Sequence, residues 1–124
     1  MSLAEFKNKV VLIDFWATWC PPCRMSIPSL VKLNQKYKGK QLVIIGVSLD
    51  EKTAPVLPFI KKENVEHLIL YGDDSVETNY RIRAIPSFYI LDKKGMIQKH
   101  YEGYYPGLEQ EWEKEINLLL KTSK

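Results

Sequence analysis

The stretch that decides the fold is residues 10–23, which read Val-Val-Leu-Ile-Asp-Phe-Trp-Ala-Thr-Trp-Cys-Pro-Pro-Cys. Residues 10–16 are an almost unbroken apolar run with β-branched and aromatic side chains, which predicts a strand buried on both faces, as in a parallel sheet. The pair Pro21-Pro22 then predicts the first turn of a helix, where a missing backbone N–H costs nothing. Cys20 and Cys23 are therefore expected between a buried strand and the N-terminus of a helix.

The elements that follow this stretch predict a βαβ unit. The helix is expected to run to about Lys38 and to stop at Gly39, with its apolar residues facing the sheet. Residues 42–47 form a second apolar run rich in β-branched side chains. Two strands joined by a helix predict a parallel pair with a right-handed crossover.

Hydrophobic periodicity and turn residues predict the remaining elements. They are a helix from Thr53 to about Glu63, a short strand over 67–71, a short helix over 75–80, a hairpin of 87–91 and 96–101, and a last helix over 108–121. No repeat or interior linker interrupts the 124 residues. Residues 1–124 are therefore expected to form a single α/β domain.

Composition excludes several classes of function. Lys and Arg number 18 against 15 Asp and Glu, a formal net charge of +3, and the lysines are scattered, which favours solvated surface positions over a nucleic-acid site.

No apolar run approaches the roughly 18 residues of a membrane span, and no secretory signal opens the chain. Residues 1–3 fit an expression scar, which leads us to expect that a leader or membrane anchor has been removed. We expect the domain itself to be a monomer.

The two cysteines, Cys20 and Cys23, are the only ones in the chain. A structural disulfide closing so small a loop would remove little entropy from the unfolded chain. A structural zinc site needs four ligands, and His67 and His100 are single residues far apart in the sequence. Neither a metal nor an organic cofactor is therefore expected, and redox chemistry of the pair is the favoured interpretation.

The position of the pair suggests a division of labour. The positive end of the helix dipole and its free N–H groups stabilise a thiolate at Cys20 and lower its pKa. Pro21 and Pro22 remove two possible donors, so we expect a moderate depression of this pKa. Cys23, one turn inside the helix, is expected to be more enclosed. Cys20 would then form the mixed disulfide and Cys23 would resolve it.

Asp14 is the exception within its apolar run. A carboxylate buried there would be costly to keep charged, so its pKa should rise, and it could accept the proton of Cys23. The alternative is that Asp14 points to water from an edge strand.

Pro86 stands immediately before a clear strand, where proline is normally unwelcome. A cis Ile85–Pro86 peptide would present the backbone of residue 85 to an extended substrate, although the sequence alone leaves the ordinary trans bond open.

These motifs together resemble the thioredoxin superfamily. Residues 14–25 with Pro28 are similar to its active-site segment, and residues 80–88 are similar to the segment that carries its cis-proline; the likeness in order and spacing extends from Lys9 to the last helix. The resemblance implies a thioredoxin fold, with a central mixed β-sheet flanked by helices. The residue roles it implies are Cys20 as nucleophile, Cys23 as resolving thiol, Asp14 as proton acceptor and Pro86 as the cis residue, with a substrate surface of Trp19, Pro21, Pro22, Ile85 and Tyr104.

Within the superfamily the chain is most similar to the TlpA/ResA-like branch. The 35 residues between Asp50 and Pro86 leave room for an extra helix and strand that minimal thioredoxins lack. Two features depart from that branch: its N-terminal hairpin is absent or trimmed, and Asp14 stands where many members carry Asn. The branch implies exchange with disulfide- or dithiol-containing proteins outside the cytoplasm, as a reductant served by an upstream thiol donor, with cytochrome c maturation as a candidate pathway.

Three other functions stay open at this point. A general cytoplasmic thioredoxin would carry the same motif. A peroxiredoxin-type peroxidase would need a Pro-x-x-x-Thr-x-x-Cys setting, which this sequence lacks. A module that binds extended peptides at the Pro86 edge, with incidental cysteines, belongs to a different class altogether.

Overall fold

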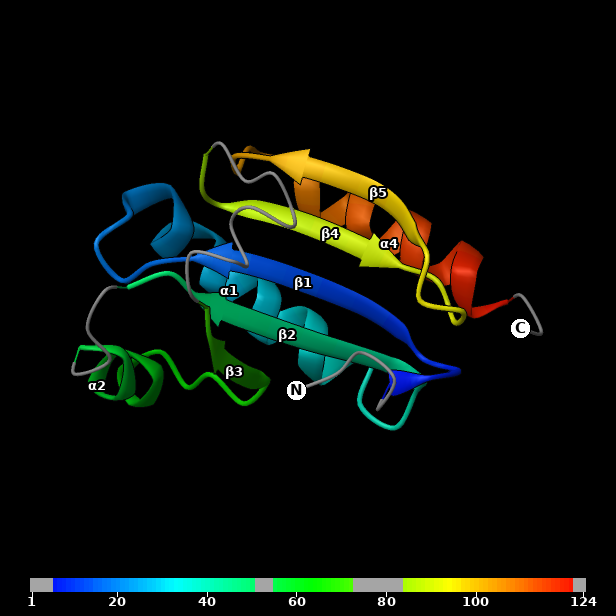
Figure 1. Cartoon of the computed structure of the whole chain (residues 1–124), viewed down its shortest axis with the longest axis horizontal. Helices are drawn as coiled ribbons and strands as arrows, with labels where there is room; N and C mark the ends of the chain where they lie inside the picture. The colour runs from blue at the N-terminus through cyan, green and yellow to red at the C-terminus, as the bar shows by residue number, and fades with distance from the viewer. Residues whose placement is uncertain (1–5, 51–54, 73–83, 122–124) are drawn as a thin grey trace.

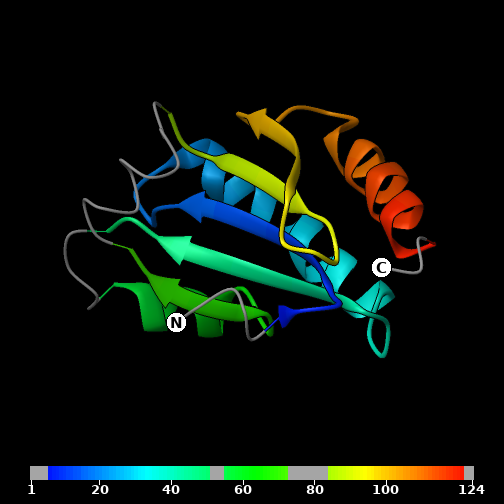
Figure 2. The same ribbon diagram turned by 45° about the vertical axis from the view of Figure 1, so that its right-hand side comes forward.

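The computed structural model describes residues 6–50, 55–72 and 84–121. Its centre is a five-stranded mixed sheet in the order β3-β2-β1-β4-β5, which forms one twisted layer in Figures 1 and 2. The strands are β1 (Val10–Trp16), β2 (Leu42–Ser48), β3 (Leu68–Tyr71), β4 (Ser87–Leu91) and β5 (Ile97–Glu102). The pairs β1–β2 and β2–β3 are parallel, whereas β1–β4 and β4–β5 are antiparallel.

Strand β1 occupies the middle of the sheet, as its apolar sequence predicts. All seven of its residues are buried. Its parallel register with β2 places Asp14 opposite Gly46 and Trp16 opposite Ser48. The C-terminal end of β1 therefore delivers the chain directly to the Cys20–Cys23 loop from the most enclosed position in the sheet.

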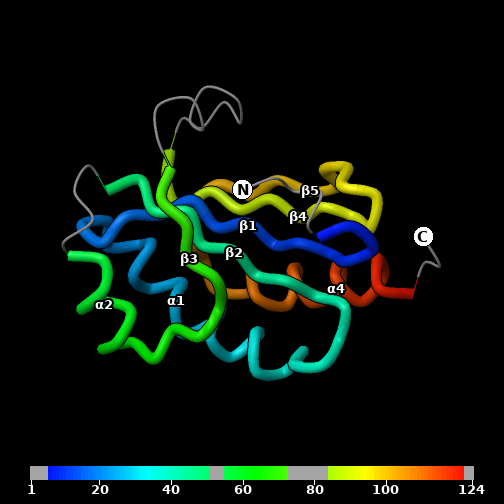
Figure 3. Tube along the Cα trace, turned by 60° about the horizontal axis from the view of Figure 1, so that its bottom comes forward, coloured from blue at the N-terminus to red at the C-terminus, as the bar shows by residue number. Residues whose placement is uncertain are grey.

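Three helices, α1 (Pro21–Lys36), α2 (Val56–Lys62) and α4 (Leu108–Leu120), lie on one side of the sheet in Figure 3. Their apolar residues and one face of the sheet share a core. The α1 residues in it are Ile27, Leu30 and Leu33, all fully buried. The main α4 contribution is Trp112, whose ring lies 4.7 Å from that of Phe88.

Helix α1 ends two residues earlier than its sequence predicts. Tyr37 is the C-cap, and the last turn tightens because the Lys38 N–H bonds to the Gln35 carbonyl at 3.3 Å, a three-residue step. Gly39 follows in the left-handed region, with φ of 82°, which explains why the chain can turn there into β2.

The predicted extra helix and strand are α2 and β3, and β3 extends the sheet by pairing with β2. Helix α2 begins at Val56; the predicted start at Thr53 and the predicted short helix over 75–80 lie outside the described residues. The hairpin of β4 and β5 and the last helix form where the pattern predicts them. Within the described part of the chain, no helix is both long enough and apolar enough to cross a membrane.

Candidate active site

Cys20 and Cys23 form a disulfide at the N-terminus of α1, with their Cα atoms 5.2 Å apart. Cys20 is the N-cap residue, and its sulfur accepts a hydrogen bond from the Cys23 N–H at 3.3 Å. Pro21 and Pro22 occupy the first two helical positions. Cys20 keeps 4% of its surface exposed and Cys23 none. The expected location of the pair and the deeper burial of Cys23 are therefore both found.

The Ile85–Pro86 peptide bond is cis, as expected. The Cys20 sulfur lies 3.7 Å from the Ile85 carbonyl oxygen; a disulfide sulfur carries no proton, so this is a contact here and becomes a possible hydrogen bond only in the thiol state. The Gly103 N–H donates to the Pro86 carbonyl at 2.8 Å. The loop after β5 is thereby fixed beside the proline, and the backbone of residue 85 lies against the reactive sulfur.

The residues predicted to contact a substrate have different environments. Trp19 is 66% exposed, and Ile85 packs partly buried against the cluster that contains both cysteines. Tyr104 is half-buried, and its hydroxyl lies 2.8 Å from the Ser29 hydroxyl, so this side chain is tied to α1. Met25 is a further apolar side chain with 65% of its surface exposed. Its position two residues after Cys23 is the only feature of the sequence that points to it as a contact residue.

Asp14 lies on the central strand with none of its surface exposed, so the alternative of a water-facing edge position is wrong. Its neighbours on the same face of β1 are Leu12 and Trp16, because side chains two residues apart share a face. Neither carboxylate oxygen has a hydrogen-bond partner among the residues that the structure describes. Burial raises the pKa of Asp14 well above its ordinary value, as the sequence predicts.

Asp50 holds the loop that precedes Cys20, a role that sequence reasoning missed. Its carboxylate accepts hydrogen bonds from the Thr18 N–H at 3.1 Å, the Thr18 hydroxyl at 2.6 Å and the Ser48 hydroxyl at 2.6 Å. Thr18 and Asp50 are 32 residues apart in the sequence, but the parallel pairing of β1 with β2 brings the two strand ends together. One carboxylate thus ties the disulfide loop to β2.

Asp50→Ala should lower the free energy of unfolding by about 2–3 kcal/mol, because three donors lose a charged acceptor. Thr18→Val removes only the hydroxyl donor and should cost about 1 kcal/mol. Urea denaturation of the two variants beside the wild type measures both values. Equal stability of Asp50→Ala and the wild type would show that this anchor contributes nothing.

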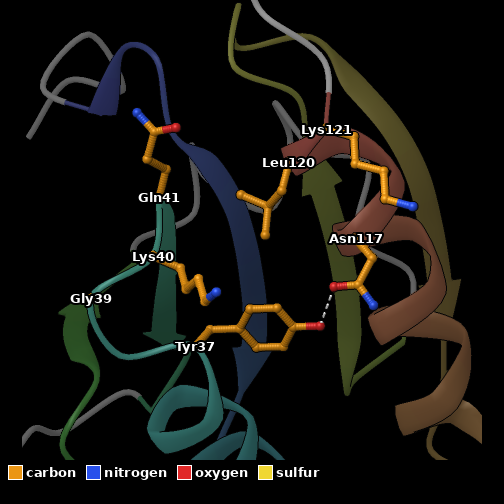
Figure 4. A pocket seen from close by; sticks show the side chains of 7 residues that line it. All are labelled: Tyr37, Gly39, Lys40, Gln41, Asn117, Leu120 and Lys121. Atoms are coloured by element: carbon orange, nitrogen blue, oxygen red, sulfur yellow. Dashed lines mark hydrogen bonds between the residues drawn. The ribbon is translucent and has the colours of Figure 1, made fainter.

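A separate groove of about 510 Å³ lies at the opposite end of the sheet from the disulfide, near the start of β2. Figure 4 shows Tyr37 and Asn117 in it, joined by a hydrogen bond of 2.6 Å. Among the described residues, no cysteine, histidine or carboxylate lines this groove. Across residues 6–50, 55–72 and 84–121, no three His, Cys, Asp or Glu side chains gather as a metal site.

Comparison with known proteins agrees with this geometry. The Redoxin family model matches residues 1–116. The thioredoxin-like protein YneN of Bacillus subtilis is 35% identical over 89% of this chain, and the thiol-disulfide oxidoreductase ResA of Bacillus thuringiensis is 31% identical over 83% of it. The chain spans 66% and 60% of the length of these two relatives.

Among solved structures, a Chlorobium tepidum protein provisionally named thiol:disulfide interchange protein DsbE superposes with a TM-score of 0.91 at 28% identity. The match covers 97% of this chain and 86% of that one. The chain therefore belongs to the Redoxin family of thioredoxin-fold proteins.

Proposed function

We propose that this chain is a thiol–disulfide oxidoreductase that reduces disulfides in other proteins through Cys20 and Cys23. The observation that carries the proposal is the Cys20–Cys23 disulfide at the N-terminus of α1, with the Ile85 carbonyl 3.7 Å from the Cys20 sulfur. The names of the ResA and DsbE relatives support this class of reaction.

The reaction proceeds in two exchanges. The Cys20 thiolate attacks a substrate disulfide, forms a mixed disulfide and releases one substrate sulfur as a thiolate, which takes a proton from solvent. Cys23 then attacks the Cys20 sulfur, forms the Cys20–Cys23 disulfide and releases the second substrate sulfur as a thiolate, which also takes a proton from solvent. Two electrons pass from the dithiol to the substrate, and the proton of Cys23 goes to a base.

The surroundings of Cys20 favour its attack. The N–H of Cys23 already donates to the Cys20 sulfur at 3.3 Å, and in the reduced protein the same bond, together with the helix dipole, stabilises a thiolate. Pro21 and Pro22 supply no N–H, so the number of donors at this helix end is limited. This combination supports a reactive thiolate with a moderately lowered pKa.

Asp14 serves as the base for Cys23. It faces the α1 side of the sheet, is wholly buried, and has a raised pKa, so it accepts a proton at a pH where an exposed aspartate would not. Cys23 itself is fully buried, which keeps its proton away from solvent and makes an internal acceptor useful.

An extended substrate segment would lie along the Ile85 backbone. Trp19, Pro21 and Pro22 border the dithiol on the α1 side, and the loop containing Tyr104 borders Pro86 on the other through the Gly103 hydrogen bond. Main-chain contacts at such an edge bind extended peptides without demanding one sequence.

The proposal includes a partner but no cofactor. Electrons move only between sulfur atoms, so neither a metal nor an organic group is needed, and an upstream thiol reductant would return Cys20 and Cys23 to the dithiol. The similarity to ResA proteins favours action outside the cytoplasm and makes the thiols of cytochrome c precursors candidate substrates.

The reduction potential of the Cys20/Cys23 pair tests the direction of exchange. Equilibration of the protein in glutathione buffers should give a value near or below about −250 mV, in the thioredoxin range. A value of about −120 to −180 mV, in the oxidant and isomerase range, would contradict a reductant role. Reduction of insulin disulfides by the wild type, with Cys20→Ser as the inactive control, tests the exchange itself.

A further inference from the structure

The end of the sheet opposite the disulfide gathers lysines that are far apart in the sequence. Strands β1 and β2 begin at this end and β4, α1 and α4 end there, on the right-hand side of Figure 1. We call this surface the basic end, and its eight lysines are Lys7, Lys9, Lys36, Lys38, Lys40, Lys93, Lys94 and Lys121. All except Lys93 are exposed.

Hydrogen bonds and a shared groove bring these segments together. The Asn8 N–H donates to the Lys93 carbonyl at 3.0 Å, and the Lys93 ammonium donates to the Leu120 carbonyl at the end of α4 at 3.1 Å. Lys40 and Lys121 both line the groove described above, and Figure 4 shows them on opposite sides of it. The fold therefore joins lysines that are scattered along the sequence into one positively charged surface.

Helix dipoles and ion pairs account for some of these charges. Lys36 and Lys121 lie at the ends of α1 and α4, where the helix dipole favours a cation. Lys36 also pairs with Glu113, and Lys38 lies 3.8 Å from Glu66. These local roles explain the lysines of the two helix ends.

The lysines beside the strands have neither role. Lys7 and Lys9 precede β1, Lys40 precedes β2, and none of the three forms an ion pair with a residue that the structure describes. Asp92, the carboxylate of the β4–β5 turn, already accepts hydrogen bonds from two backbone N–H groups of that turn. Like charges on one surface repel one another, so an anionic partner would relieve a real cost.

Exposed apolar side chains lie among these lysines. Met96 and Ile97, beside Lys94 in the β4–β5 turn, are 62% and 53% exposed, and Leu118, in the last turn of α4 near Lys121, is 59% exposed. Cations mixed with exposed apolar groups are typical of proteins that bind the surface of a bilayer. There the apolar groups enter the headgroup region and the cations lie among the phosphates.

We propose that the basic end binds peripherally to a bilayer that contains anionic phospholipids. All of its cations are lysines, which are hydrated point charges on flexible stems and suit a diffuse anionic surface; arginine is the usual choice where single carboxylates or phosphates are recognised in proteins and nucleic acids. The exposed Met96 and Ile97 favour a bilayer over a soluble acidic chain, because only a bilayer offers an apolar layer for them to enter.

Such binding sets the orientation of the disulfide. Cys20 lies at the other end of the sheet, where Asp50 contacts Thr18 and Glu102 is the register partner of Ser87. A negatively charged bilayer attracts the basic end and repels these two carboxylates. The disulfide of the bound protein would therefore face away from the bilayer and stay accessible to other proteins.

Vesicle sedimentation tests the proposal. The wild type should sediment with vesicles of equal parts phosphatidylglycerol and phosphatidylcholine, but not with phosphatidylcholine alone, and should lose affinity as salt screens the lysines. Each lysine near an anionic bilayer contributes about fivefold in affinity, so Lys40→Gln/Lys121→Gln should weaken binding about 25-fold. Both side chains are exposed, so this variant should fold and should reduce insulin in solution at the wild-type rate.

The matched control is Lys61→Gln/Lys62→Gln, which removes the same net charge from exposed positions on α2. Its affinity for the mixed vesicles should stay within about twofold of the wild type, because these lysines lie outside the basic end. Equal losses in the two double variants would overturn the inference, since binding would then depend on net charge alone. A wild type that does not sediment with the mixed vesicles would overturn it directly.

Met96→Gln separates a bilayer from a soluble acidic partner. Loss of this exposed apolar side chain should weaken vesicle binding about three- to tenfold and leave binding to polyglutamate unchanged. Tighter binding to polyglutamate than to the mixed vesicles, with no effect of Met96→Gln on either, would overturn the bilayer and indicate an acidic protein. None of these binding measurements needs a reactive thiol, so failure of the proposed redox function would not change their meaning.

Discussion

A Cys23→Ala variant should lose turnover and accumulate mixed disulfides with its substrates through Cys20. Cys20 lies at the helix N-cap beside the Ile85 carbonyl and can still attack, but the thiol that would release the substrate is gone. The adducts should appear by mass spectrometry without reductant and disappear after treatment with dithiothreitol. Because resolution is the only fast exit from this intermediate, the effect should be among the largest that one substitution produces in this chain.

The matched control is Cys20→Ala, which keeps Cys23 and removes the attacking sulfur. Cys23 has no exposed surface, so this variant should form almost no adduct with the same substrates. Adducts through Cys23 at a rate equal to those through Cys20 would reverse the proposed order of attack. Absence of adducts in both variants, together with no insulin reduction by the wild type, would instead favour a peptide-binding module with incidental cysteines.

The parts of the fold that depend on neighbouring residues could be predicted from the sequence. The run over 10–16, followed by Pro21 and Pro22, contains its own signals for a buried strand and a helix start. The hairpin turn is similar: Gly95 adopts φ of 86°, and Asp92 accepts hydrogen bonds from the backbone N–H groups of Lys94 and Met96. These turn residues and hydrogen bonds leave few alternatives to a hairpin turn at this position.

The parts that depend on packing between distant segments could not be predicted. Asp50 looks like an ordinary residue at a strand end, and only the β1–β2 register brings it to Thr18. His67 reads as a single histidine until β3 pairs with β2 and places its ring beside Gly46. The burial of Asp14 could be predicted because a charged residue stands within an apolar run. Neighbouring residues alone show this pattern, although its consequence depends on packing between distant segments.

Asp14→Asn should slow exchange and stabilise the fold at the same time. The amide cannot take the proton of Cys23, so the resolving step should slow by about 10- to 100-fold near neutral pH, at the lower end of general-base effects. Decay of a labelled mixed disulfide, followed by rapid quenching, measures this step separately from the first attack. An unchanged decay rate would remove Asp14 from the mechanism.

The stabilisation has a defined sign and pH range. Burial raises the pKa of Asp14 above the ordinary value of 3.8, so between these two values the folded protein holds a proton that the unfolded chain has released. The wild type therefore loses about 1.4 kcal/mol of unfolding free energy for each pH unit across that range. Asn carries no titrating proton, so the advantage of Asp14→Asn should grow as pH rises above the ordinary value of 3.8 and level off above the raised pKa. The control Asp92→Asn removes a charge from the exposed β4–β5 turn, and its difference from the wild type should stay constant over the same range.

Because both Asp14 oxygens lie buried without a described partner, a stability difference for Asp14→Asn that does not change with pH would mean that the carboxyl is solvated in solution. It would then be unsuited to the proton transfer proposed for it.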